Sequence, residues 1–155
     1  MIGKLKLTEQ RITAVTMMAV IAQKSRDKPI TLSDVAAIMG VSVSCLETLT
    51  PNLLARRLIR SFRGPTGGYI LAKPAKEISL LDIVLPIQSK PVKAGGQRTQ
   101  RAARALIYSQ AQALWDRMEN VQYFLLQNVT LADLLESDLD AHPFLNRILD
   151  RCEHA

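Results

Sequence analysis

Polar side chains and a cysteine stand close together at the predicted start of a helix: Ser42, Ser44, Cys45, Glu47 and Thr48. Ser44 and Thr48 are four residues apart and share one face of that helix, and Glu47 can accept a hydrogen bond from a cytosine amino group. Such side chains, at the N-terminal end of a helix that fits the major groove, are what the reading of a DNA sequence requires. A plainer interpretation is that Ser42 only caps the helix and Glu47 only favours its dipole. Both roles can hold at once, and the spacing favours a role in reading DNA.

A glycine-rich turn supplies a second candidate site, with Arg63 at its tip. The residues that hold the arginine out, and the tyrosine after them, are Gly64, Pro65, Gly67, Gly68 and Tyr69. An arginine in this position can enter the narrow, electronegative minor groove beside a major-groove site. The alternative is a solvated arginine on a turn. Arg60, like Arg56 and Arg57, is either a phosphate contact or a surface charge, and the sequence leaves that choice open.

Few residues suggest any other chemistry. Cys45 could act as a thiol switch, because a helix N-terminus favours the thiolate, although a single cysteine on a helix is more often simply packed. Cys152 stands far away near the end of the chain, and His142 and His154 lack the spaced partners of a metal site. No Ser/His/Asp constellation, phosphate-binding loop or carboxylate cluster is found. We therefore expect neither an enzyme nor a metal protein.

Two helices joined by a short turn are predicted to carry the first site. An earlier helix runs from Thr8 to near Ser25, with apolar residues at helical spacing: Ile12, Val15, Met18, Ala19 and Ala22. Thr31 caps a short helix through Met39, which Gly40 ends. The next helix starts at Ser42 or Val43 and has as its inner face Leu46, Leu49, Leu53 and Leu54. Pro51 inside it is expected to kink or shorten it. This pattern is typical of a helix-turn-helix.

Two short runs of strand-forming residues, 58–62 and 69–73, flank the glycine-rich turn and predict a β-hairpin. A helix-turn-helix followed directly by such a hairpin is a winged helix. Ser79 is expected to cap a further helix through about Gln88. The predicted fold class is therefore mostly α, with a small β-hairpin wing and a long C-terminal helix.

That long helix is predicted over residues 102–128. Apolar residues recur along it at intervals of three and four, as in a coiled coil: Ala103, Ile107, Ala111, Leu114, Met118, Val121 and Leu125. At 1.5 Å per residue the helix would be about 40 Å long, which a body this small cannot cover. We therefore expect a second copy to bury this seam, with Trp115 as a further anchor of the interface or core. Thr130 should cap another short helix, and residues 143–150 form a weak helical tail.

The charge is strongly divided along the 155 residues. Residues 1–104 hold 17 Lys and Arg against 6 Asp and Glu, whereas residues 105–155 hold 3 against 8. A basic first part favours a polyanionic partner such as duplex DNA. We expect a DNA-binding domain over 1–88, a basic loop over 89–101 and a dimerisation segment over 102–155. No apolar run is long enough to span a membrane and no signal peptide is seen, so we expect a cytoplasmic protein.

The sequence resembles the bacterial regulator family that includes the iron–sulfur cluster regulator IscR, the nitric-oxide sensor NsrR and the cysteine-metabolism repressor CymR. The likeness extends from residue 7 to about 135, and Arg63-Gly-Pro-Thr-Gly-Gly-Tyr69 is its most specific part. Further matching segments are Leu7-Thr8, Ala14-Val15, Ser42–Glu47, Glu77–Ile83, Leu114-Trp115 and Val129–Leu134. The resemblance implies a winged-helix regulator in which Ser42, Ser44 and Glu47 match positions that contact bases.

Three departures from the family pattern matter. Members with a cluster carry three closely spaced cysteines before the long helix, but residues 89–104 contain no Cys or His and offer cations instead: Lys90, Lys93, Arg98, Arg101 and Arg104. The family's opening Gly-Arg-Tyr-Ala-Val reads Arg11-Ile-Thr-Ala-Val15, so an arginine expected near phosphate is displaced by one position. Cys45 replaces an aromatic residue of the recognition helix. We therefore expect no cofactor and judge a 2Fe-2S cluster unsupported.

The favoured function is sequence-specific DNA binding by a homodimer, mainly as a repressor, at a pseudo-palindromic promoter site. One alternative is a protein-interaction module that has lost its DNA role, which Pro51 and the displaced arginine favour. Another is a redox sensor based on a thiol or a cluster. Any effector would be an unidentified small molecule or partner protein.

Overall fold

The computed structural model describes residues 8–25, 28–87, 102–136, 142–144, 146, 147 and 150, and only the backbone of residues 102–108, 112 and 115. The predicted loop at 89–101 and Cys152 lie outside these residues. The elements are the helices α1 (Glu9–Lys24), α2 (Leu32–Met39) and α3 (Val43–Ala55), the strands β1 (Ile59–Phe62) and β2 (Gly68–Leu71), the 3-10 helix η1 (Ala75–Glu77), and the helices α4 (Leu80–Val84), α5 (Ala102–Asn128) and α6 (Leu131–Leu135).

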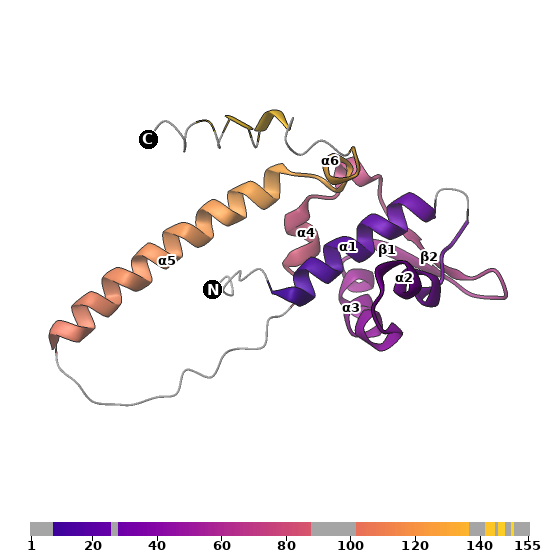
Figure 1. Cartoon of the computed structure of the whole chain (residues 1–155), viewed down its shortest axis with the longest axis horizontal. Coiled ribbons are helices and arrows are strands. Elements are labelled where there is room, and N and C mark those ends of the chain that lie inside the picture. Colours follow the sequence, from indigo (N-terminus) through magenta and orange to yellow (C-terminus); the bar gives the residue numbers. More distant parts are fainter. Residues whose placement is uncertain are drawn as a thin grey trace.

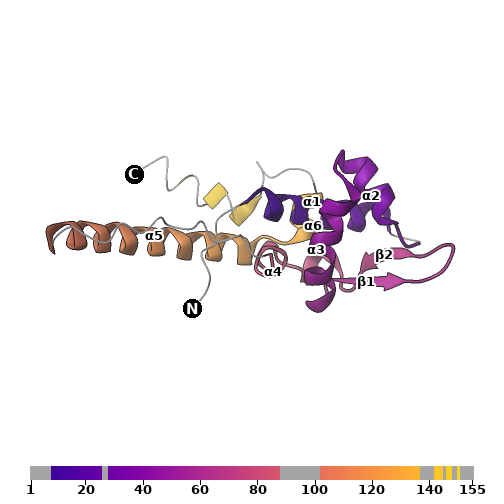
Figure 2. The same ribbon diagram turned by 90° about the horizontal axis from the view of Figure 1, so that it is seen from below.

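The first four helices and the two strands gather at one end of the molecule, and α5 runs away from them as a long rod (Figure 1). The view from below places the hairpin and the far end of α5 at opposite ends of the structure (Figure 2). α6 folds back against the body, where it packs next to α1 and η1 (Figure 1). We refer to α1–α4 with the hairpin as the reading body. This architecture confirms the predicted fold class of a winged helix with a long helix after it.

Local capping chemistry sets where α2 and α3 begin. The hydroxyl of Thr31 accepts a hydrogen bond from the Asp34 N–H at 3.1 Å, and the hydroxyl of Ser42 accepts one from the Cys45 N–H at 3.3 Å. Gly40 ends α2 with a left-handed φ of 67°, which an L side chain adopts at a cost. The predicted helix-turn-helix and its caps are therefore confirmed.

The wing is a two-stranded antiparallel hairpin, with Ile59 opposite Leu71 and Phe62 opposite Gly68. An isolated bridge joins it to Ile30, two residues before α2. The N–H of Tyr69 donates to the carbonyl of Ile30 at 2.8 Å, and the N–H of Ile30 donates back at 3.1 Å. Gly68 makes this approach possible, because a Cβ at that position would lie 2.4 Å from the Ile30 carbonyl oxygen.

The core of the reading body is aliphatic and includes residues of every helix in it. α6 belongs to the same core, since Leu131 is fully buried and its N–H donates to the Ile78 carbonyl at 2.8 Å. The N–H of Leu80 donates to the Val129 carbonyl, also at 2.8 Å. The end of α5 is thereby fastened to the start of α4. Among the described residues, no single helix has the length and apolarity to cross a membrane; α2 and α3 would pass that test only as a pair bent by 119°.

Three local predictions need correction. Ile12 is 55% exposed, because the buried face of α1 instead runs through Arg11, Ala14, Met17, Met18 and Ile21. α4 ends at Val84 and not near Gln88, since Pro86 has no N–H with which to continue the helix. Pro51 does not shorten α3, which continues to Ala55. The proline removes one backbone N–H donor from the helix. The helical hydrogen-bonding pattern continues beyond it, since the N–H of Arg56 donates to the Asn52 carbonyl at 3.2 Å.

Candidate nucleic-acid interface

The first turns of α3 present polar side chains to solvent. Ser42, Ser44, Glu47 and Thr48 are exposed, and Cys45 is half-buried. The hydroxyls of Ser42 and Ser44 lie 3.1 Å apart, and the Thr48 hydroxyl donates to the Cys45 carbonyl at 2.7 Å. A hydroxyl that donates once keeps lone pairs that can still accept. This end of α3 therefore offers hydrogen-bonding groups and one carboxylate to a partner.

The opposite face of α3 fixes that orientation. Leu46, Leu49 and Leu53 are buried in the core, and the buried Thr50 hydroxyl donates to the Leu46 carbonyl at 2.7 Å. Rotating the helix would bring these side chains into water, at a cost of about 1.5–3 kcal/mol for each large apolar side chain. The core thus holds the polar face outward.

The tip of the wing projects a single arginine. Arg63, Gly64 and Pro65 are exposed, and the N–H of Gly67 closes the turn on the Gly64 carbonyl at 2.9 Å. Gly64 has a φ of 112°, in the region that favours glycine. A Cβ at Gly67 would lie 2.4 Å from the Phe62 carbonyl oxygen. The turn therefore needs these glycines, and it leaves the guanidinium free to meet a partner.

The other predicted residues of the wing lie nearer the scaffold. Gly67, Gly68 and Tyr69 are half-buried, and Tyr69 packs against the core. Their evident structural role is to hold the wing against the segment before α2. Arg60 is exposed on β1, as are Arg56 and Arg57 in the connection from α3. The candidate interface therefore has a polar helix end, an arginine at the wing tip and exposed cations that lie between the two along the chain.

The backbone conformation of Arg57 was not predicted from the sequence. The residue has a φ of 54°, the left-handed conformation in which helices often end, usually at glycine. Its N–H donates to the Leu54 carbonyl at 2.9 Å. α3 therefore turns into β1 through an arginine in a conformation that L side chains rarely adopt.

Arg11 is a second residue whose place was not predicted. It is 5% exposed, and its Nε donates to the Ile87 carbonyl at 3.1 Å. Burial lowers the pKa of Arg11, and nearby Tyr123 and Glu119 partly offset that effect. The displaced arginine therefore points into the molecule, and it is not available to a phosphate in this arrangement.

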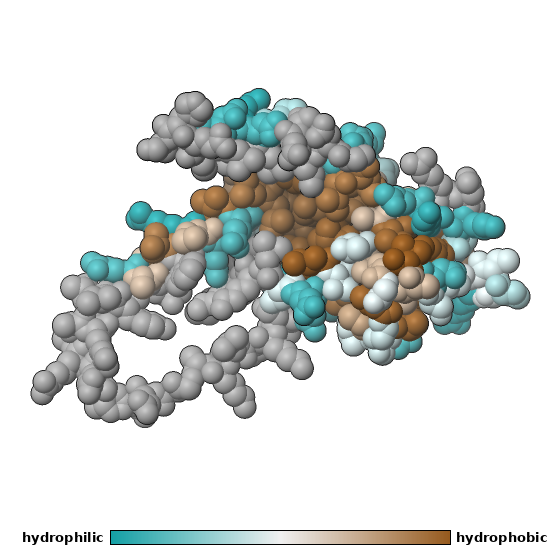
Figure 3. All heavy atoms as spheres, viewed as in Figure 1, coloured by the Kyte–Doolittle hydropathy of each residue, from teal (hydrophilic) through white to brown (hydrophobic). Residues whose placement is uncertain are grey.

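The predicted seam on α5 is exposed at four of the five positions whose side chains are described. Leu114 is 60% exposed and Val121 57%, and Ala111 and Met118 are also exposed, whereas Leu125 is half-buried. The side chains of Ile107 and Trp115 lie outside the described residues. Phe124 is an exposed apolar residue that the heptad spacing did not include. Hydrophobic residues also gather where α5 approaches the body (Figure 3).

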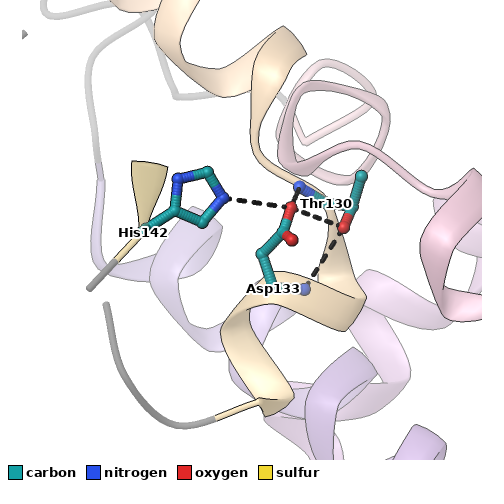
Figure 4. Close-up of polar contacts among 3 residues, drawn as sticks. All are labelled: Thr130, Asp133 and His142. Carbon is teal, nitrogen blue, oxygen red and sulfur yellow. Dashed lines mark hydrogen bonds and ion pairs between the residues drawn. The ribbon is translucent and has the colours of Figure 1, made fainter. Parts of the chain in front are cut away.

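Residues after α6 return to the end of α5 and to α6. Asp133 closes a capping box with Thr130, and the Nε2 of His142 lies 3.4 Å from the same carboxylate (Figure 4). Burial alone would raise the pKa of Asp133, but the two Thr130 hydrogen bonds and the His142 contact outweigh it and lower that pKa. Phe144 packs on Phe124 with ring centroids 5.5 Å apart.

The donor chemistry does not fit an iron–sulfur cluster. No group of three or more His, Cys, Asp and Glu side chains that could hold a metal is found among the described residues. Cys45, the one described cysteine, lies at the outward end of α3. The other cysteine is Cys152, and the segment before α5 contains only cations as titratable side chains. Cationic Lys and Arg are not metal ligands.

The fold and this arrangement of side chains define a winged helix-turn-helix protein of the DNA-binding regulator class. Comparison with known families agrees, since the Rrf2 family, described as an iron-dependent transcriptional regulator, matches residues 7–137. The chain belongs to the Rrf2 family.

Individual relatives lead to the same class. The HTH-type transcriptional regulators IscR of Serratia proteamaculans and Yersinia enterocolitica are each 34% identical over 137 residues, covering 86% of this chain and 80% of the relative. Among solved structures, T. potens IscR has a TM-score of 0.67 at 27% identity, covering 89% of this chain and 91% of that one. CymR, the global cysteine regulator of B. subtilis, has a TM-score of 0.65 at 26% identity, covering 85% and 97%.

Proposed function

We propose that this protein is a sequence-specific, DNA-binding transcriptional repressor that acts as a homodimer on a pseudo-palindromic promoter site. The observation that carries the proposal is the pairing of the exposed polar end of α3 with the exposed Arg63 at the tip of the wing. α3 supplies hydrogen-bonding groups for base edges in the major groove. Arg63 supplies a cation for the adjacent minor groove.

The exposed seam on α5 supports the homodimer. Leu114, Met118 and Val121 lie three and four residues apart and are all exposed, as in one half of a helix pair. A second copy that covers them would place two reading bodies on one duplex, which two-fold symmetry matches to a pseudo-palindromic site. Occupying a promoter in this way is the simplest route to repression.

The test is selection of bound duplexes from a random pool by the full-length protein. The expected result is an enriched motif with two related halves about one helical turn apart. A pool that stays random after repeated rounds would contradict the proposal and favour a protein-interaction module. The intact length of α3 past Pro51 supports DNA binding over that alternative.

We also propose that the protein works without an iron–sulfur cluster, although the description of its family is that of an iron-dependent regulator. Four thiolates would have to come from Cys45 and Cys152 of two copies, and Cys45 lies on the helix assigned to DNA. Protein purified without oxygen should be colourless and free of iron and acid-labile sulfide. A brown preparation with stoichiometric iron would contradict this. In a protein without a cluster, the effector would be a small ligand or a partner protein.

A further inference from the structure

An aromatic side chain at the end of the wing faces away from the core. Phe62 is the last residue of β1 and is 46% exposed. On the inner face of the hairpin, Ile59 is buried and Leu71, opposite it, packs against the core. Side chains alternate between the two faces along a strand, so Phe62, three residues after Ile59, lies on the outer face. The phenyl ring is therefore a surface group of the wing.

The neighbouring strand brings no side chain over this ring. Phe62 is paired with Gly68, whereas an aromatic residue in a hairpin is commonly covered by the side chain of its cross-strand partner. Gly68 has no room for a larger residue, because a Cβ there would lie 2.4 Å from the Ile30 carbonyl oxygen. The close contact that fastens the wing to the body therefore also keeps the outer face open beside Phe62.

Cations stand on either side of the ring along the chain. Arg60 lies two residues before Phe62 on the same face of β1, Arg63 follows it directly, and both arginines are exposed. The tip of the wing projects beyond the helices of the reading body (Figure 2). Positive charge at this place favours a polyanion over an apolar protein surface. The minor groove of DNA accepts both kinds of group, because its negative potential attracts arginine and a phenylalanine can enter between its base steps as an apolar wedge.

We propose that Phe62 is a second DNA-contacting residue of the wing, whose ring enters the minor groove beside Arg63 and partly unstacks one base step. This inference rests on the proposed function, in which the wing meets the minor groove. Pyrimidine–purine steps unstack most easily, so the wing selects such a step in the flank of each half-site. The ring makes no hydrogen bond to a base, and it reads the deformability of the duplex.

The test uses 2-aminopurine, a base whose fluorescence rises when it is unstacked, moved one position at a time along the flanks of the selected duplex. The full-length wild type should raise the fluorescence at one flanking step of each half-site. Phe62→Ala should abolish the rise and weaken binding about three- to tenfold, because less apolar surface leaves water in the complex. Phe62→Leu keeps an apolar wedge and should retain most of both effects.

The matched control is Ile38→Ala, which removes an apolar side chain that is 52% exposed on α2 and should change neither fluorescence nor affinity. A rise in folded Phe62→Ala equal to that of the wild type overturns the proposal and favours a protein partner for the ring. A wild type that binds its duplex without any rise also overturns it, while the proposed function stands. A wild type that binds no duplex overturns the proposed function and the wedge together.

Discussion

In the proposed complex Glu47 and Arg63 would meet DNA by different physics, and their substitution should have different consequences. Glu47 is exposed on the second turn of α3, where a carboxylate can accept from a base edge but also repels phosphate. Arg63 is exposed at the wing tip, where a guanidinium gains from the negative potential of a narrow minor groove. We therefore expect Glu47 to affect which base is preferred and Arg63 to affect how tightly suitable DNA is bound.

Glu47→Ala should change the preferred base at one position of each half-site with little loss of affinity. A good base contact is worth about 1–3 kcal/mol of discrimination, and the lost negative charge offsets part of the lost bond. The measurement is duplex selection with the variant beside the wild type, and Glu77→Ala, an exposed carboxylate outside α3, is the control. An unchanged motif would mean that Glu47 serves only the helix end.

Arg63→Ala should weaken binding chiefly at sites whose flanks are rich in A·T pairs and have a narrow minor groove. Loss of a hydrogen-bonding charged group costs about 1.5–3 kcal/mol, or roughly ten- to a hundredfold in Kd. Titrations on A·T-rich and G·C-rich flanks measure the difference, with Arg117→Ala as a control for lost charge. Equal weakening on both flanks would assign Arg63 to phosphate contact alone.

Individual residues were predictable where their role is local and not where it depends on distant backbone. Ser42 and Thr31 could be assigned as caps, because capping needs only the next three residues. Gly68 was placed in the wing, but its close approach to Ile30 joins residues 38 positions apart. The burial of Arg11 was not predicted, since its partner carbonyl at Ile87 carries no sequence signal.

At the scale of elements, the seam of α5 exposes the large apolar side chains of Leu114, Met118 and Val121. Replacing Leu114 and Val121 together by Lys should give monomer or aggregate and weaken DNA binding, because two half-sites are no longer bound together. Light scattering measures the mass. Ala113→Lys with Asn120→Lys, both exposed and one residue off the seam, is the matched control. A monodisperse monomer of the wild type would contradict the dimer.

The capping box of α6 should make stability depend on pH in the acid range. The pKa of Asp133 is held below its ordinary value of 3.8 in the folded protein. Its stabilisation is therefore fully present above the unfolded-state pKa and is lost as pH falls through the folded-state pKa. Asp133→Asn should lower the unfolding midpoint at pH 7 and have a smaller effect near pH 3. Glu136→Gln, an exposed carboxylate at the same helix, should follow the wild type at both.

The elements were predictable wherever apolar spacing and capping agree. The bounds of α5 and the cap of α6 were both expected. The inner face of α1 was misplaced at Ile12, because apolar residues lie all round this helix and only packing selects the buried face. α4 was predicted too long, because Pro86 lacks the N–H that would continue the helix. That α6 packs into the reading body is a tertiary fact without a local signal.

At the scale of the whole molecule, the boundary between the basic and the acidic part of the chain lies close to the boundary between the reading body and α5. The basic residues 1–104 include all of the reading body, and the acidic residues 105–155 include most of α5 and all of α6. A polyanion would be attracted to the first part and repelled by the second. The molecule should therefore approach a duplex with α3 and the wing first and α5 held away.

The salt dependence of duplex binding tests the central claim most directly, because phosphate contacts by Lys and Arg release counterions. A dimer that makes several such contacts should lose affinity for its selected duplex on the order of a hundredfold or more between about 50 and 200 mM salt. Titration of the wild type over this range gives the slope of log Kd against log salt. The account predicts a steep slope; a flat response, or no duplex binding even at the lowest salt, would contradict it.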